Sequence, residues 1–191
     1  MSERLNDALS FAAECHLGQV RKSENIPYII HPMEVAAIIG GITDKEDVII
    51  AGLLHDVVED CNVDPRVIKS RYGSRVAALV QSETEDKLAD RPPSETWMQR
   101  KEESLIMLEL TTDVDVKTLW LGDKLSNLRS MWRSYRMKGD RAFEVFHQKD
   151  KKMHGWYYRE IAKHLTELSH TAAYEEYATL VDKIFIQEVK K

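Results

Sequence analysis

The stretch that decides the fold is Val48-Ile49-Ile50-Ala51-Gly52-Leu53-Leu54-His55-Asp56-Val57-Val58-Glu59-Asp60. Its first seven residues are apolar on every side, which is typical of a helix that runs through a protein core. The residues that follow include one histidine and three carboxylates, and residues three or four apart share a helix face. His55 is therefore expected beside Glu59, and Asp56 beside both Glu59 and Asp60. Burying so many charges without a cation would be costly, so the stretch predicts a hydrolytic metal site.

An alternative interpretation is that these residues are ordinary surface dipeptides at an exposed helix end. The buried apolar run in front of them counts against it, and further ligands can be sought elsewhere in the chain. His31 stands before Pro32 at an expected helix start. Asp123, Asn127 and Ser130 are spaced by four and three residues, so one helix face would present a carboxylate, an amide and a hydroxyl together.

Length and composition predict one domain that spans residues 1–191, because 191 residues with 43% hydrophobic content are enough for a sizeable core. No apolar run approaches the roughly 18 residues of a membrane helix, and the start has no signal-peptide pattern, so a soluble cytoplasmic protein is expected. A net charge of −5 argues against a nucleic-acid coat protein. Concentrated cations such as Arg21-Lys22 instead suit a small anionic ligand.

The positions of proline and glycine predict an all-α fold, because most of the five prolines and eight glycines fall between apolar segments with helical periodicity. Asp44 and Asp64 are expected as helix N-caps, and residues 83–95 as an exposed loop. The expected helices cover residues 5–12, 31–39, 44–60, 65–72, 76–80, 95–110, 120–132, 156–168 and 174–189.

Four segments together resemble the hydrolase domain of the RelA/SpoT family, a branch of the HD-domain phosphohydrolases. They occur in the family's order, at residues 16–23, 27–32, 53–60 and 122–129. The diagnostic motifs lie within residues 16–130, and residues 136–191 are expected to form C-terminal helices of the same domain. The chain length is similar to that of the stand-alone small alarmone hydrolases.

The resemblance implies an HD-domain helical bundle that holds one divalent cation, usually manganese, in a central cleft. The ligands that it implies are His31, His55, Asp56 and Asp123. Two histidines and two carboxylates suit Mn, Fe, Co or Zn, so ligand chemistry leaves the metal open. The implied catalytic pair is Glu59 and Asp60, which would handle the water and the leaving-group proton, while Asn127 would hold substrate or water.

The resemblance also implies a set of substrate-binding residues, namely Arg21, Lys22, Ser23, Arg100, Lys101 and Ser130. A guanidinium can stack on a base and an ammonium can contact phosphate. Three departures from the family bear on the substrate. The basic loop at residues 21–27 is one residue longer and lacks glycine, Ser82-Glu83-Thr84 replaces a Gly-Val-Thr segment, and Gly122 replaces an alanine.

The implied activity is hydrolysis of guanosine 3′,5′-bis(diphosphate) or the pentaphosphate at the 3′ position, which releases pyrophosphate and GDP or GTP. Two alternatives stay open. One is hydrolysis of another phosphorylated nucleotide, such as an adenosine alarmone or the 2′-phosphate of NADPH. The other is a non-catalytic alarmone-binding or antitoxin-like module, although binding alone would not require Glu59 and Asp60. The expected partner is a small nucleotide, with no nucleic-acid polymer and no membrane; the sequence leaves a homodimer open.

Overall fold

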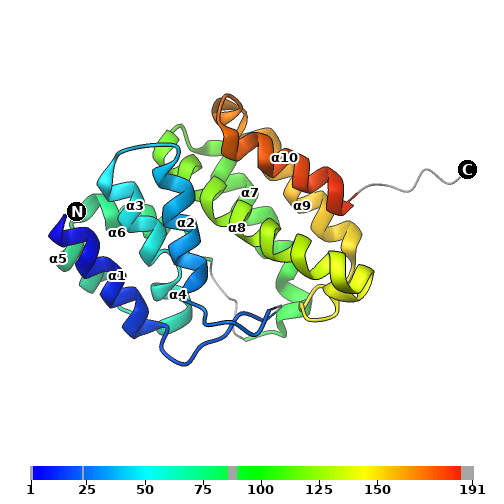
Figure 1. Cartoon of the computed structure of the whole chain (residues 1–191), viewed down its shortest axis with the longest axis horizontal. Helices are drawn as coiled ribbons and strands as arrows, with labels where there is room; N and C mark the ends of the chain where they lie inside the picture. Colours follow the sequence, from blue (N-terminus) through cyan, green and yellow to red (C-terminus); the bar gives the residue numbers. More distant parts are fainter. Residues whose placement is uncertain (1, 23, 86–89, 186–191) are drawn as a thin grey trace, which may run out of the picture.

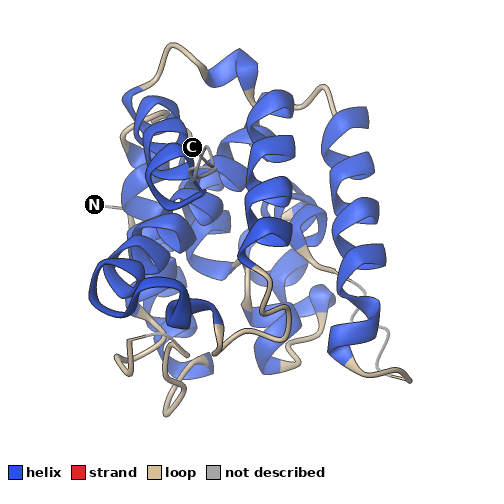
Figure 2. Cartoon of the chain, turned by 90° about the vertical axis from the view of Figure 1, so that its right-hand side faces the viewer, coloured by secondary structure: helices blue, strands red, loops and turns tan. Residues whose placement is uncertain are grey.

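The regular elements of the computed structural model are all helical across the residues that it describes, which are 2–22, 24–85 and 90–185 (Figure 2). The all-α prediction is confirmed. The helices are α1 (Glu3–Cys15), α2 (Ile30–Gly40), α3 (Glu46–Leu54), α4 (Val57–Cys61), α5 (Pro65–Tyr72), α6 (Ser74–Glu83), α7 (Pro93–Leu110), α8 (Val114–Lys138), α9 (Lys151–His164) and α10 (Ala172–Phe185), with two 3-10 turns at Gly139–Phe143 and Thr166–Leu168.

Helix α8 is the central element of the bundle. Figure 1 shows α1 to α6 on one side of it and α7, α9 and α10 on the other. Two groups of buried apolar side chains correspond to these two sides. Leu119 of α8 belongs to the first group, whereas Leu121, Leu125 and Leu128 belong to the second. A helix that is apolar on several faces is expected to be buried on several faces, and α8 therefore joins the two halves.

Two glycines allow α2, α3 and α8 to approach closely. A Cβ atom on Gly52 of α3 would lie 2.6 Å from Ile39 Cδ1, and a Cβ atom on Gly122 of α8 would lie 2.9 Å from Ile39 Cγ1. Both distances are shorter than side chains tolerate in a close-packed core. The glycine at position 122 thus has a steric reason in this chain, and the three helices that meet at Ile39 are those that carry the predicted metal ligands.

Several predicted helix ends are confirmed. The Asp64 side chain accepts a hydrogen bond from Arg66 N, with proline in the first turn of α5. Gly73 ends the same helix at a φ of +95°, a conformation that favours glycine. None of the helices in the described part of the chain combines the length and the apolar character that crossing a membrane requires.

Other predicted bounds were wrong. Helix α3 begins at Glu46, and its N-cap residue is Lys45 instead of Asp44. Arg4 binds its first carboxylates, Glu46 and Asp47, at 3.0 and 2.8 Å. Helix α8 begins at Val114, since the Asp113 side chain caps it by accepting from Asp115 N. The last four residues of the helix predicted at 174–189 lie outside the described residues.

Candidate active site

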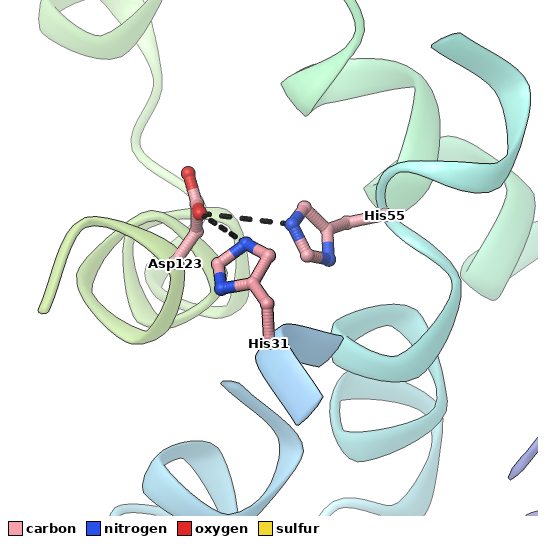
Figure 3. Close-up of side chains that lie close together, drawn as sticks. All are labelled: His31, His55 and Asp123. Atoms are coloured by element: carbon pink, nitrogen blue, oxygen red, sulfur yellow. Dashed lines mark ion pairs between the residues drawn. The ribbon is translucent and has the colours of Figure 1, made fainter. Parts of the chain in front are cut away.

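Four predicted ligands come together from three parts of the fold. His31 stands at the start of α2, His55 and Asp56 form the junction between α3 and α4, and Asp123 lies on α8. Asp123 Oδ1 lies 3.1 Å from Nε2 of His31 and 3.6 Å from Nε2 of His55 (Figure 3). Asp56 Oδ2 lies 3.5 Å and 3.0 Å from the same two nitrogens. We call these four side chains the ligand cluster.

The helix predicted through residues 44–60 is interrupted at His55 and Asp56, which is a correction to the sequence analysis. The imidazole Nδ1 of His55 donates to the Gly52 carbonyl oxygen at 2.9 Å. In an unbroken helix that carbonyl would accept from the backbone N–H of residue 56. The interruption orients the ligand pair, because it turns Asp56 toward both histidines while Asp60 N still donates to Asp56 O at 2.8 Å.

Both histidines present Nε2 to the ligand cluster as an electron-pair donor. A carbonyl oxygen can only accept, so His55 carries its proton on Nδ1. His31 Nδ1 contacts Ser126 Oγ at 2.8 Å, and its Nε2 likewise faces the carboxylates. Metal-binding histidines in proteins are held in this manner, with the second ring nitrogen bonded to the protein.

The ligand cluster attracts positive charge. Burial alone would raise the pKa of Asp123, but Lys124 and the two histidines outweigh burial and hold that pKa well below its ordinary value. Burial lowers the pKa of His31. Burial opposes a charge on His55 too, yet Asp56 and Asp123 reverse its effect and raise the His55 pKa. Protons and a metal ion would therefore compete for the nitrogen and oxygen atoms of the ligand cluster.

The donor set fits a divalent cation. Atoms from His31, His55 and Asp123 lie within 4.8 Å of one another, and all three residues are buried. Nε2 of His55 makes no hydrogen bond within residues 2–22, 24–85 and 90–185, although it is buried. A buried imidazole nitrogen that lacks a hydrogen bond and lies beside two carboxylates matches the preference of Mn, Fe, Co or Zn for imidazole and carboxylate ligands.

The predicted catalytic carboxylates lie next to this cluster on α4. Glu59 Oε2 accepts from the backbone N–H of Glu85 at 3.3 Å. The Tyr28 hydroxyl lies 2.7 Å from Asp56 Oδ2 and 3.4 Å from Asp60 Oδ2. Burial and the adjacent Asp56 raise the pKa of Tyr28, so this hydroxyl keeps its proton and donates it to the carboxylates.

A cavity of about 650 Å³ adjoins the ligand cluster and is lined by three of the six predicted substrate-binding residues. Asn127 connects the two, because its Nδ2 donates to Asp123 Oδ1 at 2.6 Å while its Oδ1 accepts from Arg21 Nη2 at 3.1 Å. The walls of the cavity include Arg21, Lys22, Asp60, Asn127 and Ser130. The structure thus brings five predicted site residues together in the walls of one cavity.

Two predicted substrate contacts already have partners or lie outside the described residues. Ser130 Oγ donates to Glu24 Oε2 at 2.7 Å, and Glu24 also pairs with Arg133. Glu24 belongs to the loop at residues 21–27 and lines a neighbouring cavity together with Lys22 and Arg133. Ser23, the third residue predicted from that loop, lies outside the described residues.

Arg100 and Lys101 do not line this cavity. Their side chains bind Glu85, with Arg100 Nη1 at 3.1 Å from Oε2 and Lys101 Nζ at 2.6 Å from Oε1. Ser104 Oγ donates to the same carboxylate at 3.0 Å. We call Glu85, Arg100, Lys101 and Ser104 the basic cluster; it borders a second cavity of about 170 Å³. The substrate-binding role of Arg100 and Lys101 stays a prediction.

Three residues near the ligand cluster received no role in the sequence analysis. Tyr28 connects Asp56 and Asp60, and Lys124 Nζ lies 2.5 Å from Asp123 Oδ2 and 3.3 Å from Glu83 Oε2. Tyr28 and Lys124 stand inside two of the segments that carry the RelA/SpoT resemblance, next to predicted ligands. Glu83 had a further signal, because Ser82-Glu83-Thr84 was one of the expected departures from the family, but only the fold places it beside Lys124.

Comparison with known proteins agrees with this arrangement. Residues 8–147 match the family described as HD domain. A guanosine-3′,5′-bis(diphosphate) 3′-pyrophosphohydrolase, MESH1 of Danio rerio, is 41% identical over 133 residues, which cover 68% of this chain and 69% of that protein. The Aquifex aeolicus protein named guanosine-3′,5′-bis(diphosphate) 3′-pyrophosphohydrolase is 36% identical over 131 residues, which are 69% of this chain. A putative chloroplastic GTP diphosphokinase of Arabidopsis thaliana, RSH1, is 38% identical over 68% of this chain.

The chain spans only 18% and 15% of the Aquifex and Arabidopsis proteins, respectively. Among solved structures, a metazoan SpoT ortholog superposes with a TM-score of 0.76 over 96% of both chains at 24% identity, which indicates a shared fold. The structure of lmo0812 from Listeria monocytogenes superposes with a TM-score of 0.70 at 31% identity, over 84% of this chain and 97% of that one.

Proposed function

Because this chain belongs to the HD-domain family, and within it to the RelA/SpoT-type branch, we propose that it hydrolyses guanosine 3′,5′-bis(diphosphate) at the 3′ position. The products would be pyrophosphate and GDP, or GTP from the pentaphosphate. The observation that carries the proposal is the convergence of His31, His55, Asp56 and Asp123 beside a cavity whose walls include Arg21 and Lys22.

His31, His55, Asp56 and Asp123 would hold one divalent cation, for which we propose manganese. Such a cation lowers the pKa of water and stabilises charge that develops on a phosphoryl oxygen. Asn127 supports the site from α8, because its amide donates to Asp123 Oδ1 and holds that carboxylate toward the two histidines. Tyr28 has the same effect on Asp56 from the opposite side.

Glu59 and Asp60 would act on the attacking water and on the leaving oxygen. The water oxygen forms a bond to the phosphorus next to the 3′ oxygen, and the bond between that phosphorus and the 3′ oxygen breaks. One carboxylate accepts the proton of the water, and the 3′ oxygen receives a proton as it leaves. Glu59 is held for this task by Glu85 N, and Asp60 lies on a wall of the cavity.

The nucleotide would occupy the cavity of about 650 Å³. Arg21 lies 5.9 Å above the centre of the Tyr28 ring and bonds to Asn127, so its guanidinium plane is held at the cavity wall, where a base can stack on it. The Lys22 ammonium would contact a phosphate group. Ser130 would exchange its Glu24 contact for one with the substrate.

A second candidate is another phosphorylated nucleotide, such as an adenosine alarmone or NADPH. The observation in its favour is Glu24 of the loop at residues 21–27, which accepts hydrogen bonds from Arg133 and from Ser130, a residue in the wall of the cavity. A changed wall at this position alters which base fits. The reaction at the ligand cluster would be the same phosphate ester hydrolysis.

The test is a substrate panel with separated products. Metal-loaded protein is incubated with 3′-diphosphate nucleotides of guanosine and adenosine, with NADPH and with simple phosphate esters. We expect pyrophosphate and GDP from the guanosine substrate. Phosphate released from NADPH alone would contradict the leading proposal and support the second, and binding of guanosine 3′,5′-bis(diphosphate) without any turnover would favour a non-catalytic module.

Four further properties stay predictions of this account. Metal analysis of the purified protein would test manganese, and sedimentation would test a homodimer. One cooperative unfolding transition is expected if residues 1–191 form a single domain, because small single domains unfold in an all-or-none manner. Fractionation of cells that produce the protein would test a cytoplasmic location.

A further inference from the structure

The two histidines of the ligand cluster are held by different hydrogen-bond partners. His55 Nδ1 donates to a backbone carbonyl, whereas His31 Nδ1 lies 2.8 Å from the hydroxyl oxygen of Ser126. That hydroxyl lies 2.6 Å from Glu34 Oε2, and the other oxygen of Glu34 accepts from Arg129 Nη1 at 3.2 Å. Ser126 is fully buried, so its hydroxyl is removed from solvent.

The direction of each hydrogen bond in this chain follows from the groups involved. The carboxylate of Glu34 is paired with Arg129 and offers acceptor atoms, so the single hydroxyl proton of Ser126 points toward Glu34. The oxygen of Ser126 can then only accept from His31 Nδ1. The proton of His31 is therefore fixed on Nδ1, and Nε2 faces the carboxylates with its electron pair.

We propose that Glu34 and Ser126 form a positioning relay that fixes the tautomer and the ring orientation of His31 for cation binding. The inference rests on the metal-dependent function proposed above and adds two residues that the site does not include. Neither residue belongs to the ligand cluster. Both act through His31, in the way that outer partners of metal-binding histidines set ring orientation and ligand basicity.

The relay connects the same two helices that supply two of the ligands. On α2, Glu34 lies three residues after His31, and on α8, Ser126 lies three residues after Asp123. Residues three apart share a helix face, so each helix presents a ligand and a relay residue side by side. Correct spacing of α2 and α8 therefore completes the ligand cluster and the relay together.

A third helix anchors the outer end of the relay. Arg129 of α8 binds Glu34 with Nη1 and Glu176 of α10 with Nε and Nη2, at 2.7 and 2.6 Å for the latter pair. The guanidinium is thus held in a fixed plane, and it holds Glu34 beside Ser126. The bidentate geometry of Arg129 with Glu176 makes this anchor more rigid than a single ion pair.

Removal of the Ser126 hydroxyl should affect metal binding more than stability. In Ser126→Ala, His31 Nδ1 loses its acceptor in a position that is closed to water, so both imidazole tautomers become populated. Loss of an outer partner of a metal-binding histidine typically lowers metal affinity about 10- to 100-fold. Glu34→Gln should have a smaller effect, because the amide oxygen still accepts from Ser126 but without charge.

The chain offers a matched control on the same helix. Ser134 lies eight residues after Ser126 and is also buried, and its hydroxyl has no hydrogen-bond partner in the described part of the protein. Ser134→Ala removes the same atom from a similar environment without touching the relay. We expect it to keep the metal affinity of the wild-type protein.

The experiment measures two quantities on the full chain labelled with 15N-histidine. The 15N shifts of His31, assigned with a His31→Gln variant, report which ring nitrogen carries the proton. Competition with a chelating dye reports the dissociation constants for Mn²⁺ and Co²⁺. We expect an Nδ1–H tautomer in the wild type and in Ser134→Ala. A mixed tautomer and an affinity loss of about 10- to 100-fold are expected in Ser126→Ala.

An unchanged His31 tautomer and unchanged metal affinity in Ser126→Ala would overturn the relay, and so would an equal loss of affinity in Ser134→Ala. If Ser126→Ala did not fold, Glu34→Ala, which removes the acceptor of the Ser126 hydroxyl proton, would decide the question with the same two readouts. A wild-type protein that bound neither cation would contradict the proposed function instead. The tautomer measurement would then still decide the relay, because it requires no metal.

Discussion

The ligand cluster and the basic cluster are both groups of largely buried charged side chains, but they differ in the charges that they bring together. In the ligand cluster, two imidazole nitrogens and two carboxylates point their electron pairs toward one another. In the basic cluster, a guanidinium, an ammonium and a hydroxyl point toward the single carboxylate of Glu85. The first group offers two imidazoles and two carboxylates, with Lys124 beside one of the carboxylates, whereas in the second group two cations share one carboxylate of the chain itself.

This difference teaches that charge type alone does not identify a binding site. In the ligand cluster, Nε2 of both histidines faces the carboxylates, although Lys124, Asn127 and Tyr28 also contact them. Arg100 and Lys101 can bind the pyrophosphate of a substrate only in competition with Glu85. The predictions below test each side of this comparison, in order of decreasing effect.

The largest effect is expected from loss of a ligand. His55→Ala should lose bound metal and all turnover, because it removes a nitrogen from the ligand cluster. Glu59→Gln should keep the metal and lose about 10²- to 10⁴-fold in turnover, the range of general acid–base catalysis. Metal content and kcat are measured on both proteins. Full activity of Glu59→Gln would remove this residue from the mechanism.

The packing beneath the ligand cluster gives the next effect. Gly122→Ala should destabilise the protein by about 1–3 kcal/mol, because the new methyl group would meet Ile39 at 2.9 Å. Ile39→Val removes a methyl group that the new side chain would contact, so the double variant should recover part of the loss. Urea unfolding measures all three variants. Equal destabilisation with and without Ile39→Val would show that Cδ1 of Ile39, at 3.3 Å from the new methyl group, is not the limiting contact.

Removal of the carboxylate from the basic cluster should strengthen anion binding, whereas removal of a ligand from the ligand cluster weakens metal binding. Glu85→Gln frees Arg100 and Lys101, so we expect inorganic pyrophosphate to inhibit about tenfold more strongly, equivalent to about 1.4 kcal/mol. Glu103→Gln is the matched control, because Glu103 borders the same small cavity but bonds to Gln99. Unchanged or weaker inhibition in Glu85→Gln would contradict competition at this position.

The smallest effect is a difference in pH dependence between Glu83 and Glu85. Burial raises the pKa of Glu83 to about 7. Burial also opposes ionisation of Glu85, but Lys101 outweighs it and lowers that pKa below its ordinary 4.5. Glu83 therefore contributes stability below about pH 4.5, which is lost as the pH rises through about 7, whereas Glu85 contributes above about pH 4.5 and loses its contribution below that value.

Urea unfolding between about pH 4 and pH 8 checks this prediction. Relative to the wild type, Glu83→Gln should gain stability as the pH rises. Glu85→Gln should lose stability above about pH 4.5 and approach the wild type in acid. Parallel profiles for the two variants would contradict the assignment of the two glutamates to different environments.

The sequence predicted the fold class from local patterns, whereas the four residues of the ligand cluster were predicted from the resemblance to the RelA/SpoT family. Helices are indicated by apolar periodicity and by the glycines and prolines that separate the apolar segments. The spacing of His55, Asp56, Asp123 and Asn127 places polar groups on defined helix faces. The interruption between α3 and α4 could not be predicted in the same way, because it arises from a side-chain hydrogen bond to the Gly52 carbonyl oxygen.

Contacts between distant segments explain what the sequence did not predict. Glu83 and Lys124 are 41 residues apart, and Ser126 and Glu34 are 92 residues apart. Each looks like an ordinary polar residue until the helices are packed. The steric reason for Gly122 likewise appears only when α2 brings Ile39 against α8.

The central claim is that a water activated at the ligand cluster attacks the phosphorus next to the 3′ oxygen of the nucleotide. Hydrolysis in H₂¹⁸O by the metal-loaded protein, followed by mass spectrometry of the products, tests it directly. The account predicts one ¹⁸O atom in pyrophosphate and none in GDP. Label in GDP, or no hydrolysis of guanosine 3′,5′-bis(diphosphate), would contradict it.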